Sequence, residues 1–374
     1  MKFKLLTIVG TRPEIIRLSS IIKKLEIFFN HKLVNTGQNF DNNLNKIFFK
    51  DLEINKPHYN LNCNSATPIK FLSKLFFKIE KVLDFEKPDA VIILGDTNSA
   101  LSAICAKRKK IPIFHIEAGN RCFDERVPEE INRKIVDHIA DINLTYSGYA
   151  SENLIREGLH KDRIIKIGSP LYEVYNDNYF KIEQSKILRK LNLESKKFII
   201  ASVHREENLN DKEGLKNILD SLLILKKKLK SKIVFSTHPR TKKIIDSIKE
   251  AYKKEINFYK PFGYLDFISL MKSSALVMSD SGSITEETSI LSIPSVNLRF
   301  AHERQEGMEY GTVIMSGLKI TNILNSADIA LAENKIGFKK ILLADYSRLQ
   351  VAQAVVNIIQ SYIPYIKDKV WNVR

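Results

Sequence analysis

The feature that most constrains this chain is a long alternation of short apolar segments, rich in β-branched residues, with longer amphipathic segments. The apolar segments lie at 4–9, 32–36, 90–94, 113–116, 142–144 and 164–167, and then at 198–202, 233–235, around 258, 276–279 and 295–298. Helical patterns between them include 15–29, 69–83, 99–108, 130–139, 215–229, 242–253 and 264–274. Continuous apolar strands separated by helices are typical of parallel sheets covered on both faces. The sequence therefore predicts an α/β fold class built from doubly wound parallel sheets.

Two such series of strands predict two Rossmann-like domains that face each other across a cleft. A chain of 374 residues is long for one domain and comfortable for two. We expect the change of domain near Gly168, with an N-terminal domain over 1–167 and a C-terminal domain over 168–350. The remaining amphipathic segment, 351–374, could pack back on the N-terminal domain as a helix.

The composition is that of a soluble globular protein, with 44% hydrophobic and 27% charged residues. The apolar run 5–9 is too short for a signal peptide, and no stretch approaches the ~20 apolar residues of a membrane span. Three cysteines, at 63, 105 and 122, are odd in number and far apart, which argues against a disulfide framework. We therefore expect a cytoplasmic protein with no integral membrane segment.

The formal net charge is +16, from 59 basic and 43 acidic side chains. Most of the excess is lysine scattered along predicted helix faces, which is typical of solvated surface, with an anionic substrate or an anionic membrane surface as the alternatives. No basic–aromatic motif supports nucleic-acid binding. No group of residues has metal-ligand spacing and there is no Asp-x-Asp motif, so we expect neither a metal nor a cofactor.

A tight turn after the apolar run 276–279 predicts a phosphate site. Ser281, Gly282 and Ser283 form the turn, and a helix-forming segment follows at once. The backbone N–H groups and the positive end of a helix converge at such a turn and suit a phosphate. Glu287 lies about one turn into the helix, where a carboxylate can accept hydrogen bonds from a ribose diol. The alternative is an ordinary capped strand–turn–helix connection.

Polar side chains also follow the strands of the first half, at the edge where parallel α/β sheets bind ligands. Arg12 lies on a glycine turn and could clamp a diphosphate, while Gln38 follows the second strand as a weaker signal. Three carboxylates, Asp96, Glu117 and Glu129, are expected on one rim. Each alone could be a helix cap or a solvated turn residue, but together they indicate acid–base chemistry.

In the second half, His204 ends the strand 198–202. A histidine in this place could neutralise or protonate a leaving phosphate, and a structural histidine is the open alternative.

Six motifs occur together and in order: Gly-Thr-Arg-Pro-Glu at 10–14, Gly-Asp-Thr at 95–97, His-Ile-Glu-Ala-Gly at 115–119, Pro-Glu-Glu-Ile-Asn-Arg at 128–133, His-Arg-Glu at 204–206 and Asp-Ser-Gly at 280–282. In these motifs the chain resembles the non-hydrolysing UDP-N-acetylglucosamine 2-epimerases over nearly its whole length. The resemblance implies a GT-B fold of two Rossmann-like domains, a UDP-sugar substrate, domain closure around it and a homodimer.

Within that family, the segments 119–130, 136–144 and 301–304 resemble the UDP-N-acetyl-L-fucosamine synthases of capsule and O-antigen pathways. Those enzymes invert C2 of a UDP-linked 2-acetamido-2,6-dideoxy-L-talose. The glucosamine epimerases generally carry a lysine in place of Arg17, a glycine in place of Ser283 and a loop about two residues longer before Pro128. The family as a whole usually has a proline where this chain has Gln305, next to Arg304. The shorter loop and the altered anion clamp favour a different hexose.

The resemblance implies elimination of UDP followed by its re-addition, and we assign roles on that basis. Glu117 and Asp96 are expected to move protons at C2, with Glu129 assisting. Arg12, His204 and the turn 281–283 are expected to hold the diphosphate, and Glu287 the ribose. The remaining substrate ligands are expected to be Arg17, Gln38, Arg133, Arg304 and Tyr264, the last against the uracil.

Other functions stay open on the sequence alone. They are a UDP-N-acetylglucosamine 2-epimerase, a UDP-sugar-dependent GT-B glycosyltransferase, a hydrolysing epimerase, and a nucleotide-sugar sensor or nucleic-acid-binding protein without catalysis.

Overall fold

The computed structural model describes residues 2–38, 42–237, 241, 244 and 250–372. The chain forms two compact units, one of Met1–Asp177 with Ala344–Arg374 and the other of Asn178–Leu343. These limits differ from the expected ones at 167 and 350. The helix α7 (Leu171–Asp177) packs on α1 (Arg12–Phe28), and the amide of Ser169 donates to the carbonyl of Asp345 at 2.8 Å. Both contacts keep residues just beyond the expected limits with unit 1.

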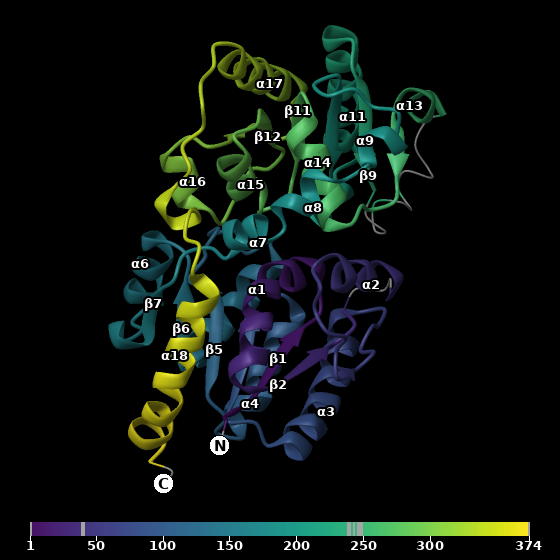
Figure 1. The fold of residues 1–374 in the computed structure, drawn as a ribbon. Helices are drawn as coiled ribbons and strands as arrows, with labels where there is room; N and C mark the ends of the chain where they lie inside the picture. The colour runs from purple at the N-terminus through teal and green to yellow at the C-terminus, as the bar shows by residue number, and fades with distance from the viewer. Residues whose placement is uncertain (1, 39–41, 238–240, 242–243, 245–249, 373–374) are drawn as a thin grey trace. The chain divides into compact units, whose positions relative to one another are not determined.

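Unit 1 is built on a parallel sheet of seven strands in the order β3-β2-β1-β4-β5-β6-β7 (Figure 1). The strands are β1 (Lys4–Val9), β2 (Asn30–Asn35), β3 (Tyr59–Asn60), β4 (Ala90–Leu94), β5 (Ile113–Ala118), β6 (Ile142–Thr145) and β7 (Ile164–Lys166). Their side chains are almost entirely buried at the centre, as the apolar runs predict for a sheet covered on both faces.

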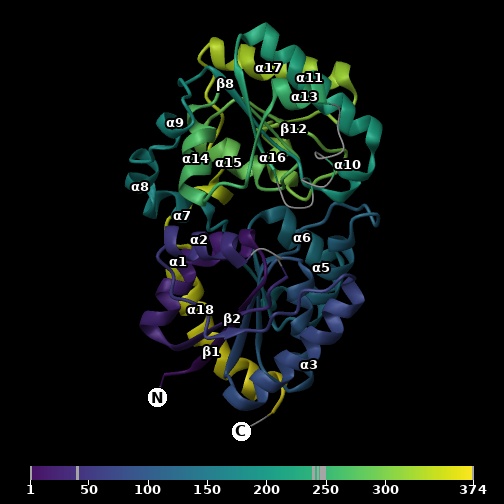
Figure 2. The ribbon, with the colours of Figure 1, turned by 90° about the vertical axis from the view of Figure 1, so that its right-hand side faces the viewer.

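Helices cover both faces of this sheet (Figure 2). The other helices of unit 1 are α2 (Asn42–Asp51), α3 (Pro68–Glu86), α4 (Ala103–Arg108), α5 (Pro128–Ile139), α6 (Gly148–Arg156) and α18 (Val351–Tyr365). One face carries α1, α7 and α18, and the other carries α3, α4 and α5. On the second face, Phe71, Leu75 and Ile79 of α3 join Leu6 and Ile8 of β1 in one buried core. The C-terminal helix α18 thus belongs to unit 1 and packs on α1.

Unit 2 has a six-stranded parallel sheet in the order β10-β9-β8-β11-β12-β13. Its strands are β8 (Phe198–Ser202), β9 (Lys232–Ser236), β10 (Asn257–Tyr259), β11 (Leu276–Ser279), β12 (Ser295–Asn297) and β13 (Ile314–Met315). Its helices include α8 (Tyr179–Glu183), α9 (Ile187–Lys190), α10 (Glu206–Asn210), α11 (Lys212–Leu229), α13 (Glu250–Glu255), α14 (Tyr264–Ser273), α15 (Ile284–Leu291), α16 (Gln305–Glu309) and α17 (Ile320–Lys335). The core includes apolar residues of α11 and α17. Most of the helix predicted over 242–253 lies outside the described residues.

Both sheets reverse their strand order at one point, between β1 and β4 in unit 1 and between β8 and β11 in unit 2. Connections leave in opposite directions at such a point, so that a crevice opens beyond the strand ends where ligands bind in open α/β sheets. The two strand pairs therefore predict where each unit carries its functional residues.

Two further findings concern the cysteines and the length of the helices. The three cysteines are all free. Among the residues that the structure describes, no helix is both long enough and apolar enough to cross a membrane.

Candidate active site

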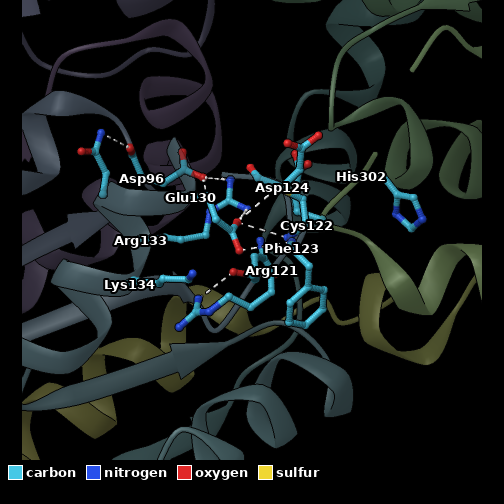
Figure 3. Close-up of polar contacts among 12 residues, drawn as sticks. Asp96, Arg121, Cys122, Phe123, Asp124, Glu130, Arg133, Lys134 and His302 are labelled. Carbon is cyan, nitrogen blue, oxygen red and sulfur yellow. Dashed lines mark hydrogen bonds and ion pairs between the residues drawn. The ribbon is translucent and has the colours of Figure 1, made fainter. Parts of the chain in front are cut away.

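Asp96, after β4, and Arg133 form an ion pair beside the point where the strand order of unit 1 reverses, the switch point (Figure 3). Arg133 projects from α5, and its Nε lies 3.0 Å from Oδ2 of Asp96, which its Nη2 also contacts. The Asn132 side chain donates to the carbonyl of Asp96 at 2.9 Å. The Arg133 side chain is 3% exposed and that of Asp96 is 26% exposed. The helix thus holds a partly exposed carboxylate against a buried cation.

Glu117 lies on a β-bulge at the end of β5. The pairing of β5 with β6 shifts by one residue between Ile116 and Ala118, and Glu117 has a φ of 68°, in the left-handed region. A bulge turns the extra side chain out of the regular alternation of the strand. Its carboxylate lies 3.6 Å from Nε of Arg17, and a Cβ placed on Gly95 would lie 4.0 Å from its Oε2. The Glu117 carboxylate therefore lies beside the turn that carries Asp96.

Glu129 and Glu130 open α5 and have different surroundings. Glu129 is half-buried, at the second position of the helix. Glu130 is fully buried and accepts the amides of Cys122 and Phe123, each at 3.2 Å, as well as Nη1 of Arg133 at 2.9 Å. Glu130 therefore fixes the preceding loop, and Glu129 is the residue of the pair that remains accessible.

The other expected ligands of unit 1 lie on the same edge of its sheet. Arg12 begins α1, with its guanidinium carbon 5.9 Å from the centre of the Phe48 ring. Arg17 is buried beside Glu117, and its guanidinium carbon lies 5.7 Å from the Tyr146 ring centre. The side-chain oxygen of Gln38 accepts the Ser99 amide at 3.0 Å and its hydroxyl at 2.8 Å, so it ties the loop after β2 to the loop after β4.

The sequence did not single out Glu14, but its side chain joins the loop after β1 to the loop after β4. Its carboxylate accepts the amides of Gly10 and Thr11 and the hydroxyl of Thr97, next to Asp96. Burial raises the pKa of Glu14 to about 7, against the opposing effect of these donors. The spacing from Thr11 to Glu14 is that of a capping box, which is the signal that could have identified it.

In unit 2, His204 lies two residues after β8 and is held by Asp280, which follows β11. Nδ1 of His204 lies 3.1 Å from Oδ1 of Asp280, and the carboxylate also accepts the amides of His204 and Arg205 and the side-chain amide of Asn208. Burial raises the pKa of the Asp280 carboxyl against the effect of these donors. The His204 side chain is 34% exposed. Asp280 thus orients an accessible imidazole at the switch point.

The turn 281–283 leads into α15, as the sequence predicts. The hydroxyls of Ser281 and Ser283 lie 2.9 Å apart, and the Ser283 hydroxyl donates to Glu287 at 3.1 Å. Gly282 packs closely on Glu303, because a Cβ there would lie 2.1 Å from its Oε1. The turn therefore presents small polar side chains and backbone amides at the start of a helix.

Arg304 and Tyr264 are placed differently from the ligands that the sequence suggests. Arg304 is only 2% exposed, and its Nε lies 2.9 Å from Oε1 of the fully buried Glu286. Tyr264, the first residue of α14, is 4% exposed. The Arg304 side chain binds Glu286 of α15, and the Tyr264 side chain is buried in unit 2. Neither side chain presents an exposed surface to a ligand.

No group of three or more His, Cys, Asp or Glu side chains is arranged to hold a metal ion within the part of the chain that the structure describes. The site residues are therefore carboxylates, guanidinium groups, an imidazole and small hydroxyls, distributed over the switch points of the two sheets.

Comparison with known proteins places these features in a family. A family model described as UDP-N-acetylglucosamine 2-epimerase matches residues 23–360. The structure of UDP-N-acetylglucosamine 2-epimerase from Rickettsia bellii superposes with a TM-score of 0.91 at 44% identity, covering 99% of this chain and 100% of that one.

Two further relatives extend the comparison. A UDP-N-acetylglucosamine 2-epimerase of Methanocaldococcus jannaschii is 38% identical over 89% of this chain and 93% of its own length. A structure of the UDP-GlcNAc 2-epimerase from that organism in complex with UDP-GlcNAc and UDP has a TM-score of 0.88 at 36% identity, covering 96% and 99% of the two chains. The UDP-2,3-diacetamido-2,3-dideoxy-D-glucuronate 2-epimerase of Pseudomonas aeruginosa is 34% identical over 88% and 93%.

The fold is thus GT-B-like, and the relatives with this fold are UDP-sugar 2-epimerases, which are isomerases. The chain belongs to the non-hydrolysing UDP-N-acetylglucosamine 2-epimerase family.

Proposed function

We propose that this protein inverts C2 of a UDP-linked 2-acetamido sugar by eliminating UDP and adding it back. The observation that carries the proposal is the placement of the Glu117 carboxylate beside the turn of Asp96, each next to a buried arginine. Removal of a proton from one face of a carbon and its return on the other face require two acid–base groups within reach of that carbon.

The chemistry of the substrate explains why UDP must leave first. The C2 hydrogen of a 2-acetamido sugar is not next to a carbonyl group, so a carboxylate cannot remove it directly at neutral pH. When the C1–O bond to UDP breaks, its electron pair leaves with the diphosphate and C1 becomes an oxocarbenium centre. A carboxylate then takes the C2 proton, and the C–H electron pair forms the C1–C2 double bond of a glycal.

The return steps put the proton on the other face of C2, while UDP returns to the face of C1 that it left. A second acid delivers a proton to C2, and a diphosphate oxygen of UDP re-forms the bond to C1. We assign the proton transfers to Asp96 and Glu117, with Glu129 assisting from the start of α5. Arg17 and Arg133 keep the two carboxylates in place, and Arg12 adds positive charge for the diphosphate.

The groups of unit 2 suit the nucleotide. The amides and hydroxyls of 281–283 at the start of α15 can bind a diphosphate, because the helix end carries a positive partial charge. His204, oriented by Asp280, is assigned to the leaving diphosphate as a cation or proton donor. Glu287 lies one turn further and is assigned to the ribose hydroxyls.

For the hexose, we propose UDP-2-acetamido-2,6-dideoxy-β-L-talose, with UDP-N-acetyl-β-L-fucosamine as the product for capsule or O-antigen synthesis. The loop that Glu130 fixes presents Phe123, which is 69% exposed, and Glu130 also binds Arg133, the partner of Asp96. A 6-deoxy sugar carries a methyl group where glucosamine carries a hydroxymethyl group. An exposed phenyl ring can pack against that methyl group, whereas it offers no hydrogen bond to a hydroxyl.

UDP-N-acetylglucosamine is the second candidate substrate, because relatives with 38% and 44% identity bear the name of that epimerase. The two are separated by incubating the protein with each UDP-sugar alone and following the products by NMR. The proposal predicts a C2 epimer, still linked to UDP, from the 6-deoxy-L-talo substrate. Turnover of UDP-N-acetylglucosamine alone would assign the second candidate, and free sugar with UDP would indicate hydrolysis instead. A Glu117→Gln variant prepared in parallel excludes a contaminating epimerase.

A further inference from the structure

The buried pair His115 and Asp137 contacts the backbone next to Asp96 and next to Glu117, the two proposed acid–base residues. Both side chains are 0% exposed, and Nδ1 of His115 lies 2.8 Å from Oδ1 of Asp137. His115 belongs to β5 and Asp137 to α5, so the pair joins the strand of Glu117 to the helix that carries Arg133. Neither side chain has a role in the proton transfers proposed above.

The other ring nitrogen of His115 reaches the turn of Asp96. Nε2 lies 2.8 Å from the carbonyl oxygen of Gly95, the residue just before Asp96. A carbonyl oxygen only accepts hydrogen bonds, so Nε2 must carry a proton. Gly95 has a φ of 72°, and its amide donates to the carbonyl of Ile116 at 2.9 Å. The ring of His115 therefore fixes the peptide that aims Asp96.

Asp137 holds the far end of the Glu117 bulge. Its carboxylate oxygens lie 3.3 and 3.2 Å from the amide of Gly119, which donates to them. Gly119 has a φ of 81°, and a Cβ there would lie 2.1 Å from the carbonyl oxygen of Ala150. Glu117, in its own left-handed conformation, is thus bracketed by His115 two residues before it and Gly119 two residues after it, and both are tied to Asp137.

Neighbouring groups shift the pKa values of both His115 and Asp137. Asp137 takes Nη1 of the buried Arg121 at 2.7 Å, and Arg121 in turn binds Glu157. Burial alone would raise the pKa of Asp137, but His115 and Arg121 outweigh it and lower that pKa. Burial alone would lower the pKa of His115, but Asp137 and the Gly95 carbonyl outweigh it and raise that pKa. The protonated ring then donates from Nε2 to the Gly95 carbonyl in the loop after β4, and its Nδ1 lies against the Asp137 carboxylate of α5.

We propose that His115 and Asp137 are positioning residues that hold Glu117 and Asp96 together at the geometry required for the two proton transfers. The proposal rests on the proposed epimerase function. Strained backbone at an active site persists only where the surroundings fix it, and here His115 and Asp137 hold the backbone on either side of Glu117, whose φ is 68°. Displacing a reacting group by about 1 Å can cost about 100-fold in rate.

Two variants separate the two contacts of the ring. In His115→Gln, the amide nitrogen can take the place of Nε2 and still donate to Gly95, but the contact with Asp137 is lost. In His115→Asn, the amide nitrogen can take the place of Nδ1 and still donate to Asp137, but the Gly95 carbonyl loses its donor. We expect kcat to fall by about 10- to 100-fold in H115N and by less in H115Q, with the KM for the UDP-sugar changed by no more than about threefold.

A matched control is another buried histidine of the same sheet. His31, in β2, is 6% exposed and its Nε2 lies 2.8 Å from the Thr7 hydroxyl. His31→Gln disturbs the core of unit 1 away from Asp96 and Glu117. We expect H31Q to lower stability while keeping kcat within about twofold of the wild type.

The deciding measurement does not depend on how much of each variant is folded. For each protein we would measure the ratio of free glycal plus UDP to epimerised UDP-sugar. If Asp96 and Glu117 lose their relative position, elimination outruns reprotonation and the ratio rises in H115N and H115Q. If folded H115N and H115Q give the same ratio as the wild type and H31Q, His115 and Asp137 do not position Asp96 and Glu117. A wild type that epimerises no UDP-2-acetamido sugar would instead overturn the proposed function.

Discussion

Nδ1 of His204 lies 3.1 Å from Oδ1 of Asp280, and the same carboxylate accepts the backbone amides of His204 and Arg205. The two residues follow neighbouring strands, β8 and β11, at the point where the strand order of unit 2 reverses. A fully buried carboxylate with several donors is a rigid support for a partly exposed imidazole. This arrangement connects the topology of the sheet to the assigned role of His204.

The first prediction concerns this support. Asp280→Asn replaces one acceptor oxygen by an NH2 group that faces other N–H donors, which costs about 1–3 kcal/mol of stability. Because His204 also loses its orientation, we expect kcat to fall by about 10- to 100-fold. Steady-state kinetics and thermal unfolding measure the two effects. The control Asp220→Asn makes the same change at the carboxylate that accepts the Tyr252 hydroxyl elsewhere in unit 2. Equal kcat values for folded D280N and D220N would contradict the role of Asp280.

The second prediction concerns the strained backbone of Glu117. A non-glycine residue at a φ of 68° costs about 1 kcal/mol that glycine avoids. We therefore expect Glu117→Gly to have a free energy of unfolding about 1 kcal/mol higher than Glu117→Gln, although both lose activity by about 100-fold or more. The matched control is Glu53→Gly, at the exposed Glu53 with a φ of 52°, which should gain stability and keep full activity. A less stable E117G than E117Q would exclude strain at the bulge.

The third prediction is a pH dependence from Glu14. Its pKa is raised from 4.5 to about 7, so the folded state binds this proton more tightly than the unfolded state. The stability that this contributes is fully present below pH 4.5 and is lost as the pH rises through about 7. Relative to Glu14→Gln, which cannot titrate, the wild type should lose about 2–3 kcal/mol between pH 5 and pH 8. Denaturant unfolding across this range measures the difference, and parallel pH profiles of the two proteins would contradict it.

The fourth prediction concerns the choice of hexose. Phe123→Ser removes the exposed ring from the loop that Glu130 fixes, so kcat/KM for the 6-deoxy substrate should fall by about 10-fold or more. The value for UDP-N-acetylglucosamine should change much less, since its hydroxymethyl group gains little from the ring. Phe85→Ser, at a phenylalanine of α3 that is 78% exposed, should leave both values unchanged. A parallel loss on both substrates would remove Phe123 as a determinant of specificity.

The strands at the centre of both sheets could be predicted from the sequence, because buried parallel strands are continuous apolar runs. β1, β4, β8 and β11 have the expected bounds at 4–9, 90–94, 198–202 and 276–279. The two-residue edge strands β3 and β13 were missed, since so short a segment carries no apolar pattern. Asp96, His204 and the turn 281–283 follow strands and Glu117 lies in the last residues of β5, because parallel strands bring their carboxyl ends to one edge.

Side-chain partners could not be predicted in the same way. Nothing in the local sequence indicates that Arg304 is buried against Glu286, because that pair depends on how α15 packs on its neighbouring loop. The bulge at Glu117 was also missed, since no residue type in that segment demands a positive φ before Gly119. The pair His115 and Asp137 could not be predicted either, because its contact joins a strand to a helix and spacing along the chain does not indicate it.

The central claim is that a carboxylate removes the C2 proton and that another acid replaces it, and isotope exchange tests this claim most directly. The protein would be incubated with the 6-deoxy-L-talo UDP-sugar in D2O, and the epimerised product examined by NMR. For elimination and re-addition of UDP, we expect deuterium at C2 of the product. We expect almost no product from Asp96→Asn or Glu117→Gln. A C2 epimer that retains its original protium would contradict the proton transfers assigned to Asp96 and Glu117.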